Sequence, residues 1–252
     1  MVNKKDEKIG KVRLDILIVK RGLAESREKA QAIIAAGYVF VNDQKLDKSG
    51  SHVRGDADIR IVNEMHSYVS RGGLKLEAAL QQFSIVVEGK IALDVGASTG
   101  GFTDCLLQHG AKVVYAVDVG YGQIAWKLRK NPRVVIIERT NIRNMDEKLI
   151  TTTLDIVVID VSFISLEKVI PAILKFMKTG SELIALIKPQ FEVGRKQVGK
   201  GGVVRNAVAR DVAVNRIRDF VSKLGLNVKG VVRSPILGRN GNEEYLLYAE
   251  TE

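Results

Sequence analysis

Five apolar segments occur at intervals between residues 91 and 188. Each has an aspartate, glutamate or lysine as its last or second-to-last residue. They read IALDV, KVVYAVDV, VVIIE, LDIVVIDV and SELIALIK. Continuous runs of this kind are typical of strands buried on both faces. Stretches with helical spacing lie between and around them, among them LKLEAALQQF, GGFTDCLLQHG and ARDVAVNRIRDFVSKLG. This alternation predicts an α/β fold with a doubly wound, mostly parallel sheet.

The N-terminal part shows a different pattern, with signals for two short helices and two strands. Ser26 is placed to cap a helix that Gly37 ends; a strand followed by a turn is expected at 38–43, and a second strand at 57–62. The following polar stretch, NEMHSYVSRGG, has paired glycines that favour a junction. We therefore expect a charged tail at 1–11, a small α+β domain at 12–62, a linker at 63–69 and a large α/β domain at 70–252.

The composition is that of a globular protein with an excess of basic residues. Of 252 residues, 46% are hydrophobic and 27% charged, and the formal net charge is +10. That charge favours a polyanionic partner such as nucleic acid over a basic surface without one. Cys105 is the only cysteine and the three histidines are isolated, which argues against a disulfide and a metal site.

A location in the cytoplasm is expected from two further features. No apolar run approaches the roughly 20 residues of a membrane span. The N-terminus, MVNKKDEKIGKVR, carries charges without the apolar core of a secretory signal. We therefore expect a cytoplasmic protein that does not bind a membrane.

Several motifs of the N-terminal part resemble the S4 RNA-binding domain. They are Arg13-Leu14-Asp15, Arg21-Gly22, Ser26-Arg27, the strand and turn VFVND, and Gly55-Asp56. The resemblance implies that basic residues of the two helices meet structured RNA, and the candidates are Arg13, Lys20, Arg21, Arg27 and Lys29. Contacts of this kind position RNA without reading its sequence. The alternative is that these are ordinary solvated charges on exposed helix faces.

The stretch LDVGASTGGFTD joins the first apolar segment to a helix. Its glycines match neither the dinucleotide fingerprint nor the P-loop. Asp94 ends this strand, Asp118 the next one and Asp160 the fourth. Ligands of such sheets bind beyond the carboxyl ends of the strands, so we expect these carboxylates near one site. Asp118 is placed to accept hydrogen bonds from the two hydroxyls of a ribose.

This pattern resembles the class I S-adenosylmethionine methyltransferases, in which an acidic, glycine-rich loop lies under the methionine end of the cofactor. Ser98 departs from it, because that family usually has glycine there; NAD binding or a structural turn are the alternatives for the loop alone. The resemblance implies a Rossmann-like fold with S-adenosyl-L-methionine as cofactor. The implied binding residues are Asp94, Gly96, Ala97, Ser98, Thr99, Gly100, Asp118, Asn141 and Asp160.

Four charged residues stand at the ends of different predicted elements: Lys75, Asp160, Lys188 and Glu244. Lys188 ends an apolar strand, where an ammonium group is costly unless it is paired. The set resembles the Lys-Asp-Lys-Glu tetrad of the FtsJ-like ribose 2'-O-methyltransferases, with Glu243 as the alternative last member. Unrelated surface charges are the other interpretation.

Taken together, the S4 unit, VSRGGLKL, LDVGASTGGFTD, VIDVSFISL and IKPQFEVG resemble the TlyA family, also labelled hemolysin A, over almost the whole chain. The resemblance implies methyl transfer from S-adenosyl-L-methionine to a cytidine 2'-hydroxyl of 16S or 23S ribosomal RNA, or both, without a metal. The tetrad would be catalytic, with Lys188 helping to remove or stabilise the hydroxyl proton. The alternatives are an RNA- or ribosome-binding protein with an inactive methyltransferase fold and a membrane-active hemolysin.

A basic, glycine-rich loop, GRKQVGKGGVVRN, spans residues 194–206. We interpret Arg195, Lys196 and Lys200 as residues that grip RNA, on a loop that is mobile until the RNA binds. A disordered surface loop without this role is the alternative.

Overall fold

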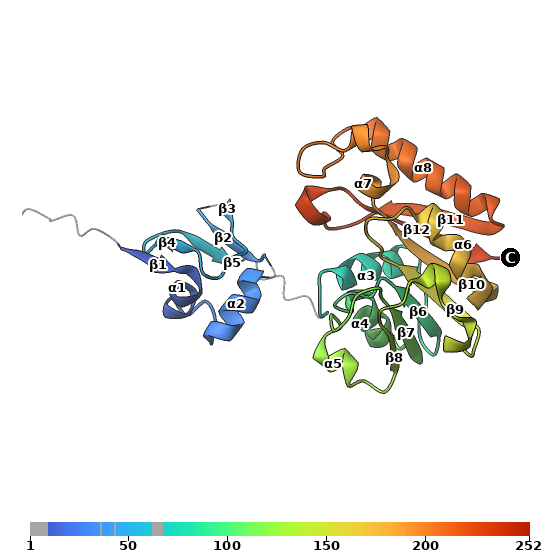
Figure 1. Ribbon diagram of the computed structural model, residues 1–252, viewed down its shortest axis with the longest axis horizontal. Helices are drawn as coiled ribbons and strands as arrows, with labels where there is room; N and C mark the ends of the chain where they lie inside the picture. The colour runs from blue at the N-terminus through green and yellow to red at the C-terminus, as the bar shows by residue number, and fades with distance from the viewer. Residues whose placement is uncertain (1–9, 36, 43, 62–67) are drawn as a thin grey trace, which may run out of the picture. The chain divides into compact units, whose positions relative to one another are not determined.

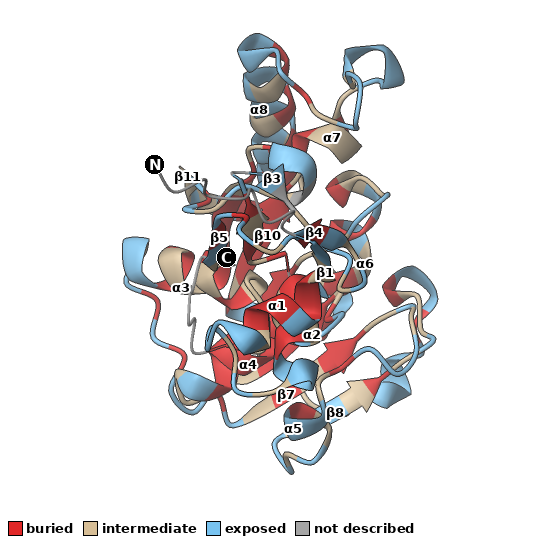
Figure 2. Ribbon diagram, turned by 90° about the vertical axis from the view of Figure 1, so that its left-hand side faces the viewer, coloured by how far each residue is buried: buried red, intermediate tan, exposed pale blue. Residues whose placement is uncertain are grey.

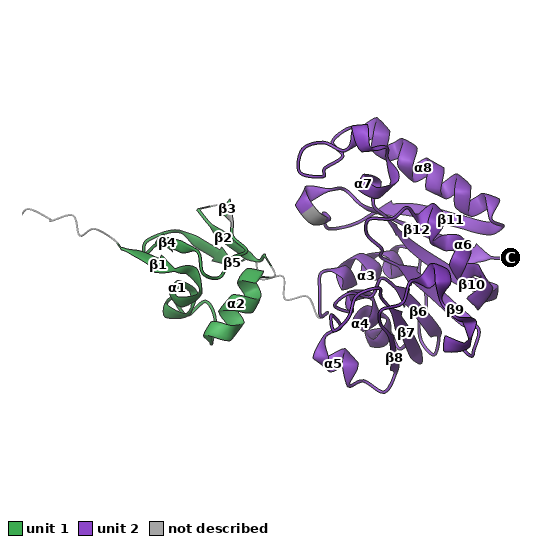
Figure 3. Cartoon of the chain, viewed as in Figure 1, with its two compact units in different colours: residues 1–65 green, residues 66–252 purple. Residues whose placement is uncertain are grey.

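Two compact units make up the chain, residues 1–65 and residues 66–252 (Figure 3). The structure, a computed structural model, describes residues 10–35, 37–42, 44–61 and 68–252 (Figure 1). Most of the expected linker, 63–67, lies outside the described residues. Tyr68 is buried in the core of the second unit, and its hydroxyl donates to Glu77 at 2.9 Å.

The first unit packs two short helices on small antiparallel sheets. Its elements are β1 (Lys11–Arg13), α1 (Leu14–Lys20), α2 (Arg27–Ala35), β2 (Val39–Val41), β3 (Gln44–Lys45), β4 (His52–Arg54) and β5 (Ile59–Ile61). β1 pairs with β4, and β2 lies between β3 and β5. Ser26 Oγ accepts a hydrogen bond from the Lys29 amide at 3.2 Å, which confirms the predicted cap. β1, β3 and β4 were not predicted, because two or three residues are too few to show an alternating pattern.

The second unit is an α/β layer structure around a seven-stranded sheet. Its helices are α3 (Gly72–Gln82), α4 (Gly101–Gln108), α5 (Trp126–Arg129), α6 (Ile170–Ile173), α7 (Pro189–Glu192) and α8 (Ala207–Lys223). Its strands are β6 (Ile91–Val95), β7 (Val113–Val117), β8 (Val134–Ile137), β9 (Leu154–Ile159), β10 (Met177–Ile187), β11 (Leu226–Arg233) and β12 (Tyr245–Thr251). The predicted doubly wound, mostly parallel sheet is confirmed.

The strand order is β11-β12-β10-β9-β6-β7-β8, and the five strands from β10 to β8 are parallel. β12 runs antiparallel to both of its neighbours. β6 lies between β7 and β9, so the chain winds to opposite sides of the sheet from this point. In such sheets a crevice for ligands opens beyond the carboxyl ends of the strands at this switch point.

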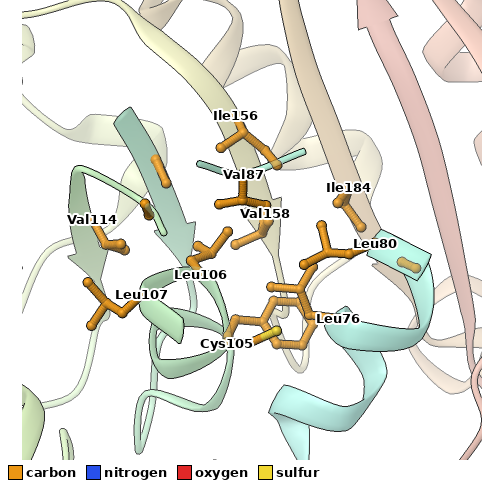
Figure 4. Close-up of a cluster of buried hydrophobic side chains, with 14 of the residues drawn as sticks. Leu76, Leu80, Val87, Cys105, Leu106, Leu107, Val114, Ile156, Val158 and Ile184 are labelled. Carbon is orange, nitrogen blue, oxygen red and sulfur yellow. The ribbon is translucent and has the colours of Figure 1, made fainter. Parts of the chain in front are cut away.

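The two faces of the sheet are covered by different helices. Strand residues alternate between two buried clusters: Val158 and Leu186 belong to the one with α3 and α4, while Val157 and Ile187 belong to the one with α6 and α8. Figure 2 shows the buried strands, and Figure 4 shows the first cluster, with Leu76 and Cys105 packed against strand residues. Burial raises the pKa of the Cys105 thiol to about 12, so this cysteine is a packing residue of the core.

The spacing of apolar residues in LEKVIPAILKFM also predicts a single helix, but this segment is divided into three short pieces. They are a 3-10 turn at Leu166–Lys168, α6, and a second turn at Leu174–Phe176. Pro171 lies in the first turn of α6, where the missing amide of proline is tolerated, but it cannot continue a preceding helix. In the described part of the chain, every helix is too short or too polar to cross a bilayer.

Candidate functional site

Five charged residues lie at the ends of strands, along the edge of the sheet where the parallel strands end. They are Asp94, Asp118, Asp160, Lys188 and Glu244. Two positions away from them along the strands stand Ala92, Ala116, Val158, Leu186 and Leu246, all members of the buried cluster under α3 and α4. Side chains two residues apart in a strand share a face. All five charged residues therefore continue the α3/α4 face of the sheet.

The glycine loop after β6 packs closely against segments that are distant from it in the sequence. Gly96 has φ +87°, and a Cβ there would lie 2.5 Å from the main-chain oxygen of Asp160. A Cβ on Gly100, φ +93°, would meet Leu128 at 2.3 Å, and one on Gly101 would meet Ser70 at 2.2 Å. Side chains at these positions would push the loop away from β9, α5 and the start of α3.

Ser98 stands where the resembling families usually have glycine. Its φ is +49°, so the serine adopts the left-handed conformation that a glycine would take. Its amide donates to Asp118 Oδ2 at 2.8 Å, and its hydroxyl contacts Gln123 Oε1 at 3.2 Å. Ser98 therefore takes a backbone conformation that is also open to glycine, and its amide closes the loop against the end of β7.

Asp94 is completely buried beneath this loop, and no ion pair of its carboxylate occurs among the described residues. Its Oδ2 accepts hydrogen bonds from the Thr103 amide at 2.9 Å and from the Thr103 hydroxyl at 2.7 Å. Its Oδ1 is buried and has no hydrogen-bond partner among the described residues. Desolvation, reinforced by the neighbouring Asp160 and Asp118 carboxylates, raises the pKa of Asp94 to about 7. The site therefore holds a carboxylate that gains from an incoming cation.

Asp118 and Asn141 lie at the ends of the next two strands. Asp118 accepts the amides of Ser98 at 2.8 Å and of Gly120 at 2.6 Å. A carboxylate has about four acceptor directions, so these two bonds orient the group and leave acceptor capacity. Asn141 Oδ1 accepts the Arg143 amide at 3.1 Å and so caps a 3-10 turn.

The four residues of the predicted tetrad form two lysine–carboxylate pairs. Lys75, on α3, donates to Glu244 Oε2 at 2.5 Å, and the Glu244 side chain is 2% exposed. Lys188 pairs with Asp160 Oδ1 at 2.5 Å and donates to Ser162 Oγ at 2.9 Å. The Asp160 side chain is 23% exposed, so the second pair is nearer to solvent than the first.

Between the two alternatives for the last member, Glu244 contacts Lys75 and Glu243 does not lie on that side. Glu243 pairs with Arg210 and with Arg233, each at 3.3 Å. The difference follows from strand alternation, because neighbouring residues point to opposite faces.

Three residues near the pairs were not singled out by the sequence. Ser162 contacts Lys188, as described above, and Gln190 Nε2 donates to Glu244 Oε1 at 3.3 Å. Glu192 is 5% exposed and accepts hydrogen bonds from Ser165 and Leu166. All three lie in VIDVSFISL and IKPQFEVG, so the motifs contained them, but no property of a serine, glutamine or glutamate in sequence indicates these contacts.

An exposed aromatic side chain lies beside the second pair. Phe163 is 84% exposed and has φ +65°, a conformation that phenylalanine rarely adopts. Its ring lies 5.0 Å from that of Phe191, at 50° between the planes. A large exposed ring at a strained position is a feature that a fold does not need for its own stability.

The basic residues predicted in the first unit are largely engaged within it. Arg13 and Arg27 pair with the buried Asp15 at 2.9 and 3.0 Å. Arg21 donates to the main-chain oxygens of Ala57 and Gly55, both at 2.7 Å. Lys29 pairs with Glu25 one helical turn away, and Lys20 is exposed. Several of these cations thus have a structural role, whatever else they bind.

The loop 194–206 is described throughout and is tied to the hairpin before β12. Asn242, 3% exposed, accepts the Val204 amide at 3.1 Å and donates to the Gly202 oxygen at 2.9 Å. Arg195, Lys196 and Lys200 are exposed, and no ion pair of theirs occurs among the described residues. The described residues contain no cluster of three or more His, Cys, Asp or Glu that could hold a metal ion.

Both units match known family models. Residues 68–251 match the FtsJ-like methyltransferase model, and residues 12–59 match the S4 domain model. These spans include all the pairs and the glycine loop described above.

Curated relatives cover nearly the whole chain. It is 44% identical over 243 residues to the 16S/23S rRNA (cytidine-2'-O)-methyltransferase TlyA of Mycobacterium tuberculosis, covering 96% of this chain and 91% of that protein. It is 49% identical over 239 residues to a provisionally named rRNA methyltransferase, YqxC, of Bacillus subtilis, covering 94% and 85%. Hemolysin A of Brachyspira hyodysenteriae is 44% identical, covering 94% and 99%.

Solved structures also resemble this chain. A provisionally named hemolysin from Streptococcus thermophilus superposes with a TM-score of 0.76 at 44% identity, covering 97% of this chain and 90% of that one. Magnesium protoporphyrin IX methyltransferase from Synechocystis, with bound S-adenosylmethionine, has a TM-score of 0.50 at 15% identity, covering 76% and 85%. The second likeness concerns the fold alone.

Proposed function

The chain belongs to the FtsJ-like methyltransferases that carry an S4 domain, the family of TlyA and hemolysin A, and from this premise we propose that it methylates the 2'-hydroxyl of a cytidine in ribosomal RNA. The observation that carries the proposal is the meeting of the buried, cation-free Asp94 and two lysine–carboxylate pairs at one edge of the sheet. The cytidine and the ribosomal RNA come from the names of relatives such as TlyA of Mycobacterium tuberculosis.

S-adenosyl-L-methionine is the proposed cofactor, and the residues at the switch point fit it. The unpartnered Asp94 Oδ1 suits a cationic ligand, and the glycine loop brings backbone rather than side chains to the crevice. We assign binding to the predicted residues, with Asp94 facing the cationic methionine end and Asp118 the ribose hydroxyls. When bound, this cofactor supplies a methyl group on a positively charged sulfur.

Lys188 is the residue we assign to the acceptor hydroxyl. A lysine ammonium has three N–H donors; Lys188 donates one of them to Ser162 and forms an ion pair with Asp160. A further N–H can face the acceptor oxygen, whose proton passes to water as the new bond to the methyl group forms, and the charge of Lys188 stabilises the negative charge that develops on that oxygen. Holding both reactants in line is the main remaining task of the site.

The pair formed by Lys75 and Glu244 supports the second side of the same site. Glu244 is held by Lys75 and by the Gln190 amide, so the pair is fixed in position while Lys188 acts. Phe163 offers an exposed ring on which a nucleobase taken out of its stack can rest, an interaction worth about 1–3 kcal/mol per base.

RNA binding is assigned to the unpaired cations of the loop 194–206 together with the basic residues of the S4 unit. Replacing Arg195, Lys196 and Lys200 by alanine should weaken RNA binding and make its dependence on salt less steep, because fewer counterions are then released. An unchanged salt dependence would contradict the assignment of this loop.

The function is tested by Lys188→Ala in an assay of labelled methyl transfer to purified ribosomal subunits. Transfer should fall by at least about a hundredfold, while cofactor binding, measured by calorimetry, is kept. The matched control is Lys178→Ala, which removes a lysine from the other end of β10 that pairs with Asp155 at 2.6 Å. It should leave transfer unchanged.

One result would reject the proposed function, and another would reject the role assigned to Lys188. Wild-type protein that binds the subunits and the cofactor but transfers nothing would point to the RNA-binding alternative. Full transfer by Lys188→Ala would leave the family assignment intact and remove Lys188 from the mechanism.

A further inference from the structure

Glu192 is a buried carboxylate close to the proposed methyl-transfer site. It ends α7, four residues after Lys188, and its side chain is 1% exposed. Three groups meet it: the Ser165 hydroxyl at 2.7 Å on Oε2, the Leu166 amide at 2.9 Å on Oε1, and Arg216 at 3.2 Å on Oε2. Burying a carboxylate is costly unless it is fully hydrogen-bonded, so this arrangement holds its parts firmly together.

Glu192 joins two segments next to Lys188: the loop after β9, which contacts it, and α7, which follows it in the chain. Ser165 and Leu166 close the loop 161–165 after β9, which carries Ser162 and Phe163. α7 follows directly after Lys188 at the end of β10. Two further contacts join the same segments, from Lys188 to Ser162 and between the rings of Phe163 and Phe191. Glu192 is the buried, charged member of this set.

We propose that Glu192 is a positioning residue of the methyl-transfer site: it fixes the loop 161–165 on α7, so that Ser162 reaches Lys188 and Phe163 keeps its exposed place. The inference rests on the proposed function and deepens it. Glu192 acts through Ser162 and Lys188 and has no contact with the reacting atoms in this assignment.

A carboxylate is required because both of its oxygens accept. Oε2 takes the Ser165 hydroxyl and Arg216 together, while Oε1 takes the Leu166 amide. The amide of a glutamine has the same size but only one accepting oxygen. Glu192→Gln therefore preserves packing but loses the hydrogen bonds accepted by one of the two oxygens. The loop is then held less firmly, and no cavity is left.

The test compares Glu192→Gln with Glu167→Gln in the full-length protein. Glu167 also pairs with Arg216, at 3.2 Å, and its replacement removes the same charge without touching the loop contacts of Glu192. Two quantities are measured: the hydrogen-exchange rates of amides 161–166, and kcat and KM for methyl transfer to ribosomal subunits.

For Glu192→Gln we expect exchange in 161–166 to accelerate about tenfold and kcat to fall about tenfold, because small misplacements at a reacting centre are costly. KM for the cofactor should stay unchanged. Glu167→Gln should match the wild type in both measurements. Wild-type exchange and kcat in Glu192→Gln would overturn the proposal, as would an equal fall of kcat in Glu167→Gln, which would assign the effect to Arg216.

If Glu192→Gln does not fold, Ser165→Ala removes the same contact from the loop side, and wild-type exchange and kcat in that variant would overturn the proposal. Absence of methyl transfer by the wild-type protein would instead defeat the proposed function. The exchange rates would then still decide whether Glu192 holds the loop.

Discussion

Among the described residues, each unit contains one aspartate with 0% exposure, and the two have opposite surroundings. Asp15, in the first unit, accepts hydrogen bonds from Arg13, Arg27 and Gln31. Those bonds, Arg13 first, hold its pKa well below the usual range. Asp94, in the second unit, has only Thr103, and burial raises its pKa to about 7.

In the proposed assignment, the contrast separates a carboxylate with a structural role from one that binds a cationic ligand. The charge of Asp15 is paired with arginines of its own unit, so no ligand is needed to compensate for its burial. Asp94 finds none, and one of its oxygens is left without a hydrogen bond among the described residues. Burial alone therefore does not indicate a binding carboxylate, whereas burial without a neighbouring cation favours one.

The largest effect is expected when Asp15 is removed. Asp15→Ala should lower the free energy of unfolding of the first unit by about 3 kcal/mol, because several charge-assisted hydrogen bonds are lost at a buried site. Hydrogen exchange of first-unit amides at increasing denaturant measures it. Asp56→Ala is the matched control, since Arg54 holds Asp56 at 2.9 Å with the same Arg-x-Asp spacing on an exposed carboxylate. An equal loss in both variants would break the comparison.

Replacing Asp94 should affect binding rather than folding. Asp94→Asn should weaken S-adenosyl-L-methionine binding by about 2 kcal/mol, roughly thirtyfold, because a cation loses its buried partner. The free energy of unfolding should not fall, since a buried unpaired charge disappears. Calorimetry and denaturant unfolding measure the two quantities. Unchanged binding with lost stability would make Asp94 structural like Asp15.

The pH dependence should have opposite signs in the two units. The folded-state pKa of Asp94 is raised, so the folded state keeps a proton that the unfolded chain releases, and stability of the second unit should decrease as pH rises from about 4 to 7. The folded-state pKa of Asp15 is lowered, so its stabilisation is complete above about pH 4 and is lost on further acidification.

Cofactor affinity reports the same ionisation. It should increase by up to about tenfold per pH unit as Asp94 loses its proton, approaching pH 7 from below. Asp94→Asn should remove that part of the pH dependence. If the variant keeps the wild-type profile, the titrating group is another one.

The smallest effect is expected at the rim of the Asp15 cluster. Arg27→Ala removes one of two cations, and its side chain is half exposed, so the cost should be about 1 kcal/mol of first-unit stability. Binding of ribosomal RNA, measured at two salt concentrations, shows whether Arg27 also meets phosphates. A stability loss with unchanged RNA affinity would make Arg27 purely structural.

Much of the fold could be predicted from the sequence because its signals are local. The buried strands of the second unit are long apolar runs, and Ser26 and Gly37 mark the ends of their helix. Short strands and the three-part segment around Pro171 could not be predicted in the same way. Their conformation depends on partners distant in the chain.

For the candidate site, residue types could be predicted but partners could not. Strand-terminal charges such as Asp160 and Lys188 are visible as exceptions to apolar runs. Which carboxylate pairs with which lysine depends on the order of the strands in the sheet and on the position of α3. No single sequence motif contains that information. The contacts of Glu192 could not be predicted either, because they join a loop after β9 with helices after β10.

The shared face of the strand-terminal charges restricts how this chain can change in length. Replacing one apolar core residue by another leaves Lys188 where it is. Deleting or inserting a single residue within β10, between the buried cluster and Lys188, would turn the ammonium group to the opposite face, towards α6 and α8. The strands can therefore drift in composition across relatives, whereas their residue count up to the charged end has to be inherited unchanged or altered in steps of two.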